Sequence, residues 1–536
     1  MDLTQEVKAW IADDPDPKTA AQLQQWLDSN NEVELRTSFS GFLQFGTAGL
    51  RGPIRPGPSG MNRAVVGRTA AGLAAYMKER NLTSVVIGRD ARYGSEDFTF
   101  ETAQIMSGAG MKVYVLPRPL PTPVLAFATN ELKCDVGIMV TASHNPPQDN
   151  GYKVYLGGTV DGIHYRGSQI VSPTDESIAQ KIDSITSLAS QPRGKEWTVL
   201  GEEVVDKYVG ITAALAHKPG NLKIVYTAMH GVGTETLQQV FHKAGFPQPI
   251  LVESQAKPDP DFPTVAFPNP EEPGAIDLAL ETARTFDADL VIANDPDADR
   301  CAAAVKDPVK GWRMLRGDEL GVILGETIAR ATTQGILANS IVSSSILSKI
   351  AAHYKLDFKE TLTGFKWLAK IDGLTFGYEE ALGYAVDAVT VNDKDGISAA
   401  IKLAQIATDL AAQNKTLLDL LDEVWVRHGF HATEQISIRL SDLSQVGVIM
   451  GNLRSNSPKE IAGRSVTSID DLAKPKDGLP PTDGLRIWLD GGIRIIIRPS
   501  GTEAKMKCYI EAIAKDSATA QAVLDQLRAP LKELLS

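Results

Sequence analysis

Short apolar runs alternate with stretches of helical spacing along most of this chain, and that alternation limits the folds open to it. From residue 64 the order is a helix at 64–79, a strand at 84–88, a helix at 96–108 and a strand at 111–116. Strands and helices that alternate in this way predict βαβ units, which build a mostly parallel or mixed sheet with helices on both faces.

The same alternation starts again near residue 222 and once more near residue 317. After about residue 427 the sequence changes to alternating strands, with one last helix at 518–535. A length of 536 residues also exceeds what a single hydrophobic core supports. We therefore predict an α/β protein with three related mixed-sheet α/β domains and a smaller C-terminal α+β domain. The predicted bounds are 1–206, 207–317, 318–427 and 428–536.

The apolar pattern predicts further elements within these bounds. Residues 1–40 alternate charged and apolar positions around a Pro-Asp-Pro break, which predicts two short helices. Other strands are expected at 136–140, 222–227, 289–293, 340–344, 435–440 and 493–498, and other helices at 275–286, 319–331, 347–354, 396–412 and 417–426. Asp318 stands just before the helix at 319–331 and is a residue type that caps helices.

Acidic residues outnumber basic ones by 66 to 54, which gives a formal net charge of −12. This charge argues against nucleic acid or an anionic membrane as a partner, and an anionic ligand would need a local basic cluster or a metal. No apolar run approaches the roughly 20 residues of a membrane span, and the first residues lack the pattern of a signal peptide. The cysteines at 134, 301 and 508 form neither a disulfide framework nor a zinc pattern, so a cytoplasmic location is expected.

A serine follows the apolar run at 136–140, in the segment Thr141-Ala142-Ser143-His144-Asn145-Pro146-Pro147. Asn-Pro-Pro ends the predicted strand and opens a loop. Ser143 next to His144, with Lys153 ten residues on, is typical of a nucleophile with basic partners. The same segment by itself fits a polar turn at a strand end equally well.

Three carboxylates alternate in Asp295-Pro296-Asp297-Ala298-Asp299-Arg300, directly after the strand at 289–293. Their spacing allows Asp295, Asp297 and Asp299 to point oxygens around a hard divalent cation, and Mg²⁺ suits oxygen ligands with an open position. The segment lacks the glycine and distal glutamate of a calcium EF-hand. Arg300 adds a planar cation that can grip phosphate. The alternative interpretation is a solvated acidic turn.

Arg498-Pro499-Ser500-Gly501-Thr502-Glu503 follows the strand at 493–498 and brings together a guanidinium, two hydroxyls and a glycine. Such a set can cradle an anion through side-chain donors and backbone N–H groups. A plain turn would not need so many phosphate donors, although the segment also fits one.

Two weaker signals complete the set. Glu379 and Glu380 lie in a predicted loop between Gly377 and Gly383, where adjacent carboxylates suit paired sugar hydroxyls but are more often simply solvated. The glycine-rich segment at 45–53 carries one cation, Arg51, and by itself fits a plain turn.

The serine segment, the aspartate trio, the glutamate pair and the anion cradle each fall in a different predicted domain. A serine can carry a phosphoryl group, a metal held by carboxylates can neutralise charge in the transfer, and an anion cradle can hold a second phosphate. Together they indicate phosphoryl transfer to and from a small polyol that bears phosphate at a remote position.

With these motifs in order, the chain resembles the α-D-phosphohexomutase superfamily, the phosphoglucomutases and phosphomannomutases, from about residue 45 to residue 511. The resemblance implies four domains around a central cleft with one motif from each, and Mg²⁺ as cofactor. The string Gly-Tyr-Glu-Glu-Ala-Leu-Gly-Tyr, with Asp393-Lys394-Asp395-Gly396 after it, is most similar to the longer phosphoglucomutase-2-like branch.

The resemblance also implies a role for each motif residue. Ser143 would be the phosphoserine, and with its phosphate Asp295, Asp297 and Asp299 would bind Mg²⁺. The implied contacts of the reacting phosphate are Arg51 and Arg300, with Lys153 and His144 as acid/base partners. The implied sugar-binding residues are Gly364, Phe365, Lys366, Glu379 and Glu380, and the implied residues for the distal phosphate are Arg498, Ser500, Gly501 and Thr502.

The implied reaction converts glucose 1-phosphate into glucose 6-phosphate. Glucose 1-phosphate would receive the phosphate of Ser143 to form glucose 1,6-bisphosphate, which would then turn around and return its other phosphate to Ser143. A small phosphosugar is the expected partner, and the chain would be a monomer or homodimer. Mannose and pentose phosphates remain possible substrates, because Ala381 stands where many members of the family have a serine. Two functions of other classes also fit the motifs, but less well than a mutase does. They are a phosphoserine-type phosphatase of the alkaline-phosphatase kind and an inactive mutase-like binding protein.

Overall fold

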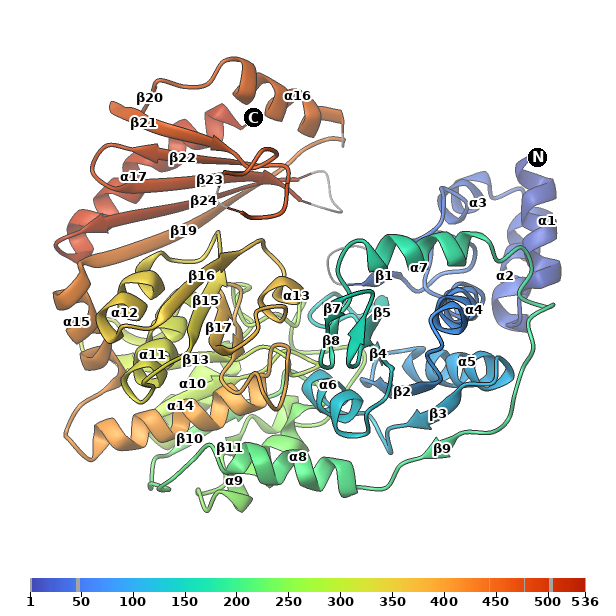
Figure 1. Ribbon diagram of the computed structural model, residues 1–536, viewed down its shortest axis with the longest axis horizontal. Helices are drawn as coiled ribbons and strands as arrows, with labels where there is room; N and C mark the ends of the chain where they lie inside the picture. Colours follow the sequence, from blue (N-terminus) through green and yellow to red (C-terminus); the bar gives the residue numbers. More distant parts are fainter. Residues whose placement is uncertain (1, 45–48, 443, 477, 501–504, 536) are drawn as a thin grey trace. The chain divides into compact units, whose positions relative to one another are not determined.

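The computed structural model describes residues 2–44, 49–442, 444–476, 478–500 and 505–535 (Figure 1). The chain divides into two compact units. Unit 1 contains Met1–Leu315, Ala369–Asp372 and Gly383–Asp409, and unit 2 contains Arg316–Leu368, Gly373–Leu382 and Leu410–Ser536. No helix formed by the described residues is long and apolar enough to cross a membrane.

Unit 1 begins with three helices, where the sequence pattern predicted two. They are α1 (Leu3–Asp13), α2 (Pro17–Asp28) and α3 (Glu32–Ser38). The prediction was wrong because Asn30 adopts a left-handed conformation and the side chain of Asn31 caps a new helix. The three helices pack on one another around a small apolar cluster of Val7, Leu23 and Leu35.

The first sheet of unit 1 has the order β1-β5-β4-β2-β3-β9, with β8 paired to β5. Its strands are β1 (Leu50–Pro53), β2 (Ser84–Arg89), β3 (Lys112–Val115), β4 (Val136–Val140), β5 (Asp149–Leu156), β8 (Ser168–Gln169) and β9 (Thr198–Val199). Its helices are α4 (Arg63–Glu79), α5 (Ser95–Gly108), α6 (Thr122–Glu131) and α7 (Thr174–Asp183), and β6 (Thr159–Val160) and β7 (Ile163–His164) form a separate hairpin. The sheet is mixed, as predicted, because β4 pairs in parallel with β2 and antiparallel with β5.

The second sheet of unit 1 has the order β11-β10-β12-β13-β14 and is also mixed. Its strands are β10 (Ile224–Thr227), β11 (Ile250–Leu251), β12 (Leu290–Ala293), β13 (Ala302–Asp307) and β14 (Gly311–Met314). Its helices are α8 (Glu203–Ala213), α9 (Gly233–Lys243) and α10 (Asp277–Phe286), with the short 3₁₀ helix η1 (Glu253–Gln255).

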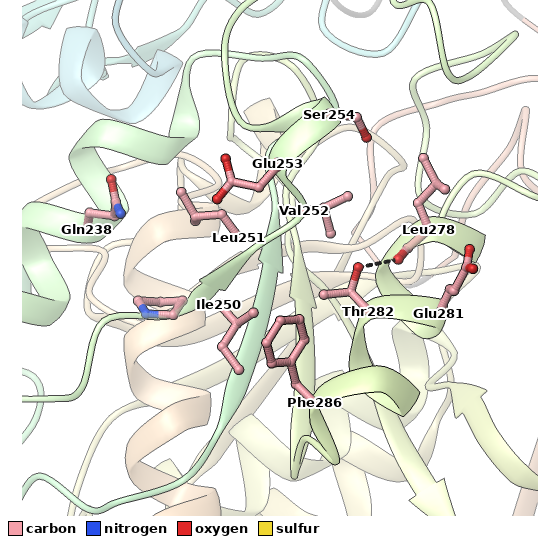
Figure 2. Close-up of a pocket in the computed structure, with 11 residues that line it drawn as sticks. Gln238, Ile250, Leu251, Val252, Glu253, Ser254, Leu278, Glu281, Thr282 and Phe286 are labelled. Atoms are coloured by element: carbon pink, nitrogen blue, oxygen red, sulfur yellow. Dashed lines mark hydrogen bonds between the residues drawn. The ribbon is translucent and has the colours of Figure 1, made fainter.

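An open groove runs beside the edge strand β11 (Figure 2). It is lined by Gln238, Pro249, Ile250, Leu251, Val252, Glu253, Ser254, Leu278, Glu281, Thr282 and Phe286. Thr282 donates its hydroxyl hydrogen to the carbonyl of Leu278, so this polar side chain is satisfied within α10. None of the residues predicted for catalysis or binding lines the groove.

A separate segment, residues 383–409, completes unit 1. It contains β18 (Gly383–Ala385) and the start of α14 (Gly396–Ala411). Gly383 forms an isolated bridge with Arg300, and Gly396 donates to the carbonyl of Ala298. A Cβ at Gly396 would lie 2.2 Å from the carbonyl oxygen of Arg300, so only glycine allows this approach to the aspartate loop.

The described residues of unit 2 form two sheets. The first has the strand order β16-β15-β17, and the second has the order β19-β24-β23-β22-β21-β20. The strands are β15 (Ile336–Ser340), β16 (Asp357–Thr361), β17 (Leu374–Glu379), β19 (Phe430–Arg439), β20 (Glu460–Ile461), β21 (Arg464–Asp471), β22 (Leu485–Leu489), β23 (Ile493–Pro499) and β24 (Lys505–Ala514). The helices are α11 (Gly317–Arg330), α12 (Ile346–Tyr354), α13 (Phe365–Leu368), α15 (Leu417–His428), α16 (Ser444–Ser455) and α17 (Ser517–Leu534).

Two local predictions for unit 2 were wrong. The strand expected at 340–344 is β15, which ends at Ser340, because the chain turns after it and the hydroxyls of Ser343 and Ser344 bond to Ser340 and Glu511. Asp318 does not cap α11. The helix begins one residue before it, at Gly317, and the Asp318 carboxylate instead accepts from the backbone N–H of Ser344.

Three motif residues lie on regular elements where loops were predicted. Arg51 is on the edge strand β1, and Glu379 is the last residue of β17. Phe365 begins the short helix α13. In each case a glycine nearby had suggested a loop, but Gly52 and Gly377 are accommodated within strands.

Close packing in unit 1 predicts that Gly231 cannot be replaced without loss of stability. A Cβ there would lie 2.3 Å from Cα of Pro296, so Gly231→Ala should destabilise the protein by about 1–3 kcal/mol. Gly210, within α8, is the control because a Cβ there meets nothing within 4 Å, and Gly210→Ala should be neutral or stabilising. Thermal melting of the two variants checks the prediction, and equal midpoints would contradict it.

Candidate active site

Ser143 lies in a strained turn just beyond the end of β4. Its φ is 52°, in the left-handed region, and its backbone N–H donates to the Thr141 hydroxyl at 2.9 Å. Thr141 in turn donates to Asp90 at 2.7 Å. Such a conformation persists only where surrounding contacts impose it, and here a chain of buried hydrogen bonds does so.

Arg92 is the main support of this turn. The side chain of Arg92 is only 1% exposed and pairs with Asp90 at 3.4 Å. Its guanidinium donates to four carbonyl oxygens of the loop, those of Ser143, Asn145, Pro146 and Asp149. These contacts make residues 89–92 a structural turn. Arg92 therefore positions the serine loop.

The three aspartates lie together beyond the end of β12 and are fully buried. One oxygen from each of Asp295, Asp297 and Asp299 lies within 4.8 Å of the others. Asp295 Oδ2 accepts a hydrogen bond of 2.7 Å from Ser143 Oγ, so the hydroxyl and the acidic cluster are in direct contact. The interpretation as a solvated acidic turn is wrong, because the carboxylates are not solvated.

Two lysines and a threonine satisfy part of this negative charge. Lys153, on β5, donates to Asp297 at 2.8 Å and to Asp299 at 2.9 Å. Lys394, just before α14, pairs with Asp299 at 3.3 Å, and Thr122 donates to Asp297 at 2.6 Å. These contacts bring four separate segments of unit 1 to one point.

The acidic cluster has the donor chemistry of a divalent metal site. Among the described residues, neither Asp297 Oδ1 nor Asp299 Oδ1 accepts a hydrogen bond, although both oxygens are buried. Asp299 Oδ1 has only a long ion-pair contact of 3.9 Å with Arg300. Buried carboxylate oxygens need a partner, and those without a hydrogen bond suit a hard cation. The residues present therefore fit Mg²⁺.

Crowding of the carboxylates splits their pKa values. Burial, together with the charges of the other two aspartates, raises the pKa of Asp295 well above its ordinary value. Burial acts in the same direction on Asp297 and Asp299, but the nearby lysine ammonium groups outweigh it and lower both pKa values. Such a site favours extra positive charge beside Asp295.

His144 and two arginines surround the hydroxyl. His144 Nδ1 lies 3.2 Å from Ser143 Oγ. Desolvation, with Arg300 and Arg51 nearby, lowers the pKa of His144 well below its ordinary value, so the imidazole is neutral at pH 7. Arg51 donates to Asn145 at 2.7 Å, and the backbone N–H of Arg300 donates to Asp295 at 3.0 Å. A neutral imidazole beside a hydroxyl can accept its proton.

Unit 2 holds the carboxylate pair. Glu379 accepts from the backbone N–H of Gly364 at 2.6 Å, which joins two of the predicted sugar-binding segments. Glu380 accepts from Ser340 at 3.1 Å and from Ser343 at 3.0 Å. Burial, and then the charge of Glu379, raises the pKa of Glu380. The pair is therefore held by defined donors rather than solvated.

Arg498 belongs to the same unit and lies near this pair. Its charge acts on both Glu380 and Tyr509 and lowers the pKa of each against the effect of burial. Ser500 follows, and its backbone N–H donates to the carbonyl of Lys505. Gly501 and Thr502 lie outside the described residues. Lys366, on α13, lies with its Nζ 5.9 Å from the centre of the Trp367 ring.

The predicted residues thus form one group in each unit. In unit 1 the structure brings together Arg51, Ser143, His144, Lys153, Asp295, Asp297, Asp299 and Arg300, and in unit 2 Gly364, Glu379, Glu380 and Arg498. Sequence reasoning gave no role at the site to Thr122, Arg92, Lys394 or Ser343. The charged string before α14 is a usable signal for Lys394, whereas a lone threonine or serine carries none.

Family models match the chain in four consecutive segments. The models describe domains I, II and III and the C-terminal domain of phosphoglucomutase/phosphomannomutase, and they match residues 43–189, 204–311, 316–428 and 451–529. The chain belongs to the phosphoglucomutase/phosphomannomutase family. It is accordingly a phosphosugar mutase, an intramolecular phosphotransferase. Our own domain bounds remain a prediction.

The names of three curated relatives, a phosphomannomutase, a phosphopentomutase and a phosphoglucomutase, agree with this assignment. A probable phosphomannomutase of Haemophilus influenzae is 49% identical and covers 89% of this chain and 98% of its own. A mouse phosphopentomutase is 34% identical over 96% of this chain and 90% of its own. A Staphylococcus haemolyticus phosphoglucomutase is 34% identical over 90% of this chain and 92% of its own.

The fold matches solved structures of the family. A phosphoglucomutase/phosphomannomutase family protein from Burkholderia thailandensis superposes with a TM-score of 0.71 over 92% of this chain and 97% of its own, at 19% identity. The three α/β domains and the C-terminal domain predicted from the sequence are therefore confirmed as a fold class.

Loss of one aspartate should weaken metal binding. Asp297→Asn removes one charged ligand of the cluster and should weaken Mg²⁺ binding by about tenfold or more. Asp287→Asn is the control, because Asp287 is an exposed residue that pairs only weakly with Lys306. Calorimetric titration with Mg²⁺ checks this, and equal affinity for the two variants would remove Asp297 from the site.

Proposed function

We propose that this mutase interconverts hexose 1-phosphates and hexose 6-phosphates, with glucose as its principal substrate, through a phosphorylated Ser143. The observation that carries the proposal is the 2.7 Å hydrogen bond from Ser143 Oγ to a buried, cation-supported aspartate cluster. A plain hydroxyl has no need of such surroundings, whereas a phosphoryl group carries about two negative charges that need cations beside it.

Asp295, Asp297 and Asp299 are the proposed Mg²⁺ ligands. When bound, Mg²⁺ supplies positive charge that offsets the charge on the oxygens in phosphoryl transfer. The aspartates hold the ion, and Lys153 stays with two of them, at 2.8 and 2.9 Å.

The proposed cycle begins with phospho-Ser143 and a hexose 1-phosphate. The bond between phosphorus and Ser143 Oγ breaks, and a new bond forms to the 6-hydroxyl oxygen of the sugar. His144, neutral at pH 7, accepts the proton that the hydroxyl releases and passes it to the departing Ser143 Oγ, which lies 3.2 Å from its Nδ1. The products are the 1,6-bisphosphate and free Ser143.

The second half of the cycle uses the same groups on the other end of the sugar. After the bisphosphate has turned around, Ser143 Oγ attacks the phosphorus at position 1 and passes its proton to His144. Lys153 is the proposed acid for the departing sugar oxygen, because the charges of Asp297 and Asp299 raise its pKa against the effect of burial and so keep a proton on it to donate. The proton left on His144 balances the one that Lys153 gives up. Arg51 and Arg300 are the proposed contacts of the transferring phosphate.

Unit 2 supplies the proposed binding groups for the rest of the substrate. Glu379 and Glu380 accept hydrogen bonds from two sugar hydroxyls, with Gly364, Phe365 and Lys366 beside them. Arg498, Ser500, Gly501 and Thr502 hold the phosphate that is not reacting. A cation and hydroxyl donors suit a phosphate dianion, and charge-assisted bonds are the stronger kind.

Mannose is the second candidate sugar, favoured by the 49% identity to a probable phosphomannomutase. Glucose and mannose differ only at C2, so a carboxylate pair that accepts from two other hydroxyls does not separate them. A pentose phosphate places its two ends at a different separation and should fit both phosphate sites less well.

The role of Ser143 is tested by Ser143→Ala. The variant should lose mutase turnover by a factor of at least about 10⁴. It should also take up no labelled phosphate from glucose 1,6-bisphosphate, because the oxygen that accepts the phosphate is gone. Ser184→Ala, in a surface helix cap, is the control and should behave as the parent. Residual turnover above a few per cent would overturn the phosphoserine mechanism, and dominant release of free phosphate by the parent would indicate a phosphatase.

Substrate preference is tested by comparing kcat/KM for glucose, mannose and ribose 1-phosphates. Glucose and mannose phosphates should differ by no more than about 100-fold, since a single epimeric contact separates them. Ribose 1-phosphate should be the poorest of the three. A ribose value above both hexose values would overturn the proposed substrate class while leaving the phosphoserine mechanism in place.

A further inference from the structure

An ion pair that the proposed reaction does not use lies buried in unit 2. Arg494 on β23 stands opposite Glu511 on β24 in the antiparallel register, and their side chains meet at 3.0 Å. Arg494 is 3% exposed and Glu511 is 2% exposed. Burial opposes the charge of Glu511, but Arg494 and then His431 outweigh it and lower its pKa to about 2. The pair is therefore fully charged.

Both members of the pair reach out of their own sheet to the turn after β15. Arg494 donates to the carbonyl oxygen of Ser343. Glu511 accepts from the hydroxyl of Ser344 at 2.6 Å and from the backbone N–H of Ser345 at 2.8 Å. Three consecutive residues of the turn are thus fastened to two neighbouring strands of the other sheet.

The same turn holds the sugar-binding carboxylate. The Ser343 hydroxyl donates to Glu380 at 3.0 Å and accepts from the backbone N–H of Glu380 at 3.1 Å. Ser340 donates to the same carboxylate oxygen at 3.1 Å. The position of Glu380 therefore depends on where the Ser343 backbone is held.

The phosphate-binding arginine is attached to the same pair through the strand. Arg498 follows Arg494 by four residues on β23, and residues at this spacing project from the same face of a strand. Its partner Tyr509 precedes Glu511 by two residues on β24. Between them Ile496 packs with Ile341, Val342 and Leu362 in one apolar cluster, which keeps this face of the sheet against the turn.

We propose that the Arg494–Glu511 pair is a positioning device that sets the distance between Glu380 and Arg498, and so the length of phosphosugar that the two can hold together. The proposal rests on the proposed function, in which Glu380 binds the sugar and Arg498 the remote phosphate. Neither Arg494 nor Glu511 touches the substrate. Their action passes through Ser343 and through strand β23.

Arg494→Lys is the first test. Lysine keeps the charge but cannot bond Glu511, Glu360 and the Ser343 carbonyl at once, as the guanidinium does. The sugar and the remote phosphate are held throughout the reaction, so KM for hexose 1-phosphate should rise about tenfold with kcat nearly unchanged. Arg454→Lys is the matched control, since Arg454 pairs with Asp471 and Asp483 in the same unit, and its KM should equal that of the parent.

A double-mutant cycle separates positioning from general loosening of the fold. In a Glu380→Gln background the positioning of residue 380 matters less, so Arg494→Lys should raise KM there by no more than about twofold. Ser344→Ala removes the hydroxyl contact to Glu511 and a longer one, at 3.3 Å, that the hydroxyl accepts from the backbone N–H of Ile346. It should raise KM in the same direction and keeps the test valid if Arg494→Lys does not fold. Equal effects of Arg494→Lys in both backgrounds, or a parental KM in Ser344→Ala and Arg494→Lys, would overturn the proposal.

The two proposals fail in different ways. If the parent and Arg454→Lys do not turn over hexose phosphates, the proposed function is wrong. If both turn them over normally and Arg494→Lys does so with the same KM, only the positioning role is wrong.

Discussion

Three buried carboxylates within 4.8 Å of one another are costly to assemble, and much of unit 1 is organised to make that arrangement stable. Each cation that offsets the charge comes from a different part of the chain: Lys153 from β5, and Lys394 from the segment before α14. Thr122 reaches the cluster from the start of α6. Two mixed sheets and a third segment thus meet at the aspartates. The placement of these elements in unit 1 and the balance of charge at the site therefore depend on each other.

Unit 2 also buries a charged carboxylate, in a smaller cluster of charged side chains. Glu511 is buried with a low pKa because Arg494 and His431 lie beside it, and the remaining hydrogen bonds fasten the turn after β15. A buried ion pair by itself is weak evidence for stability, since desolvation offsets the attraction. The pair instead fixes the positions of its partners, because buried charges are stable only when every partner is in place. That is why we assign it a positioning role.

Much of the fold was predictable because it rests on local pattern. The strand 136–140 was placed to the residue, and the helices at 64–79 and 96–108 lie within one residue of α4 and α5. The failures have local physical causes. Asn30 breaks a helix through a left-handed conformation that many residues avoid, and Gly377 lies within a strand although glycine usually suggests a loop.

The site was predictable only where several acidic or basic residues lie close in sequence. Asp295, Asp297 and Asp299 are recognisable by their spacing, whereas Thr122 and Ser343 are single polar residues whose roles arise from long-range contacts. Arg92 belongs with them, because its four carbonyl contacts lie more than 50 residues away in sequence. Long-range hydrogen bonds leave no local pattern, so neighbouring residues in the sequence do not reveal them.

In the proposed cycle, the contact between Ser143 and Asp295 would link metal binding to the phosphorylation of the serine. A phosphoryl group on Ser143 Oγ removes the hydrogen that Asp295 now accepts and adds about two negative charges beside a carboxylate whose pKa is already raised. Lys153 and Lys394 are engaged with Asp297 and Asp299 and cannot offset both groups. A divalent cation adds two positive charges at the same place. Electroneutrality therefore favours the phosphoserine and the metal together. Phosphorylation of Ser143 should strengthen metal binding, and the bound metal should favour the phosphorylated serine to the same extent.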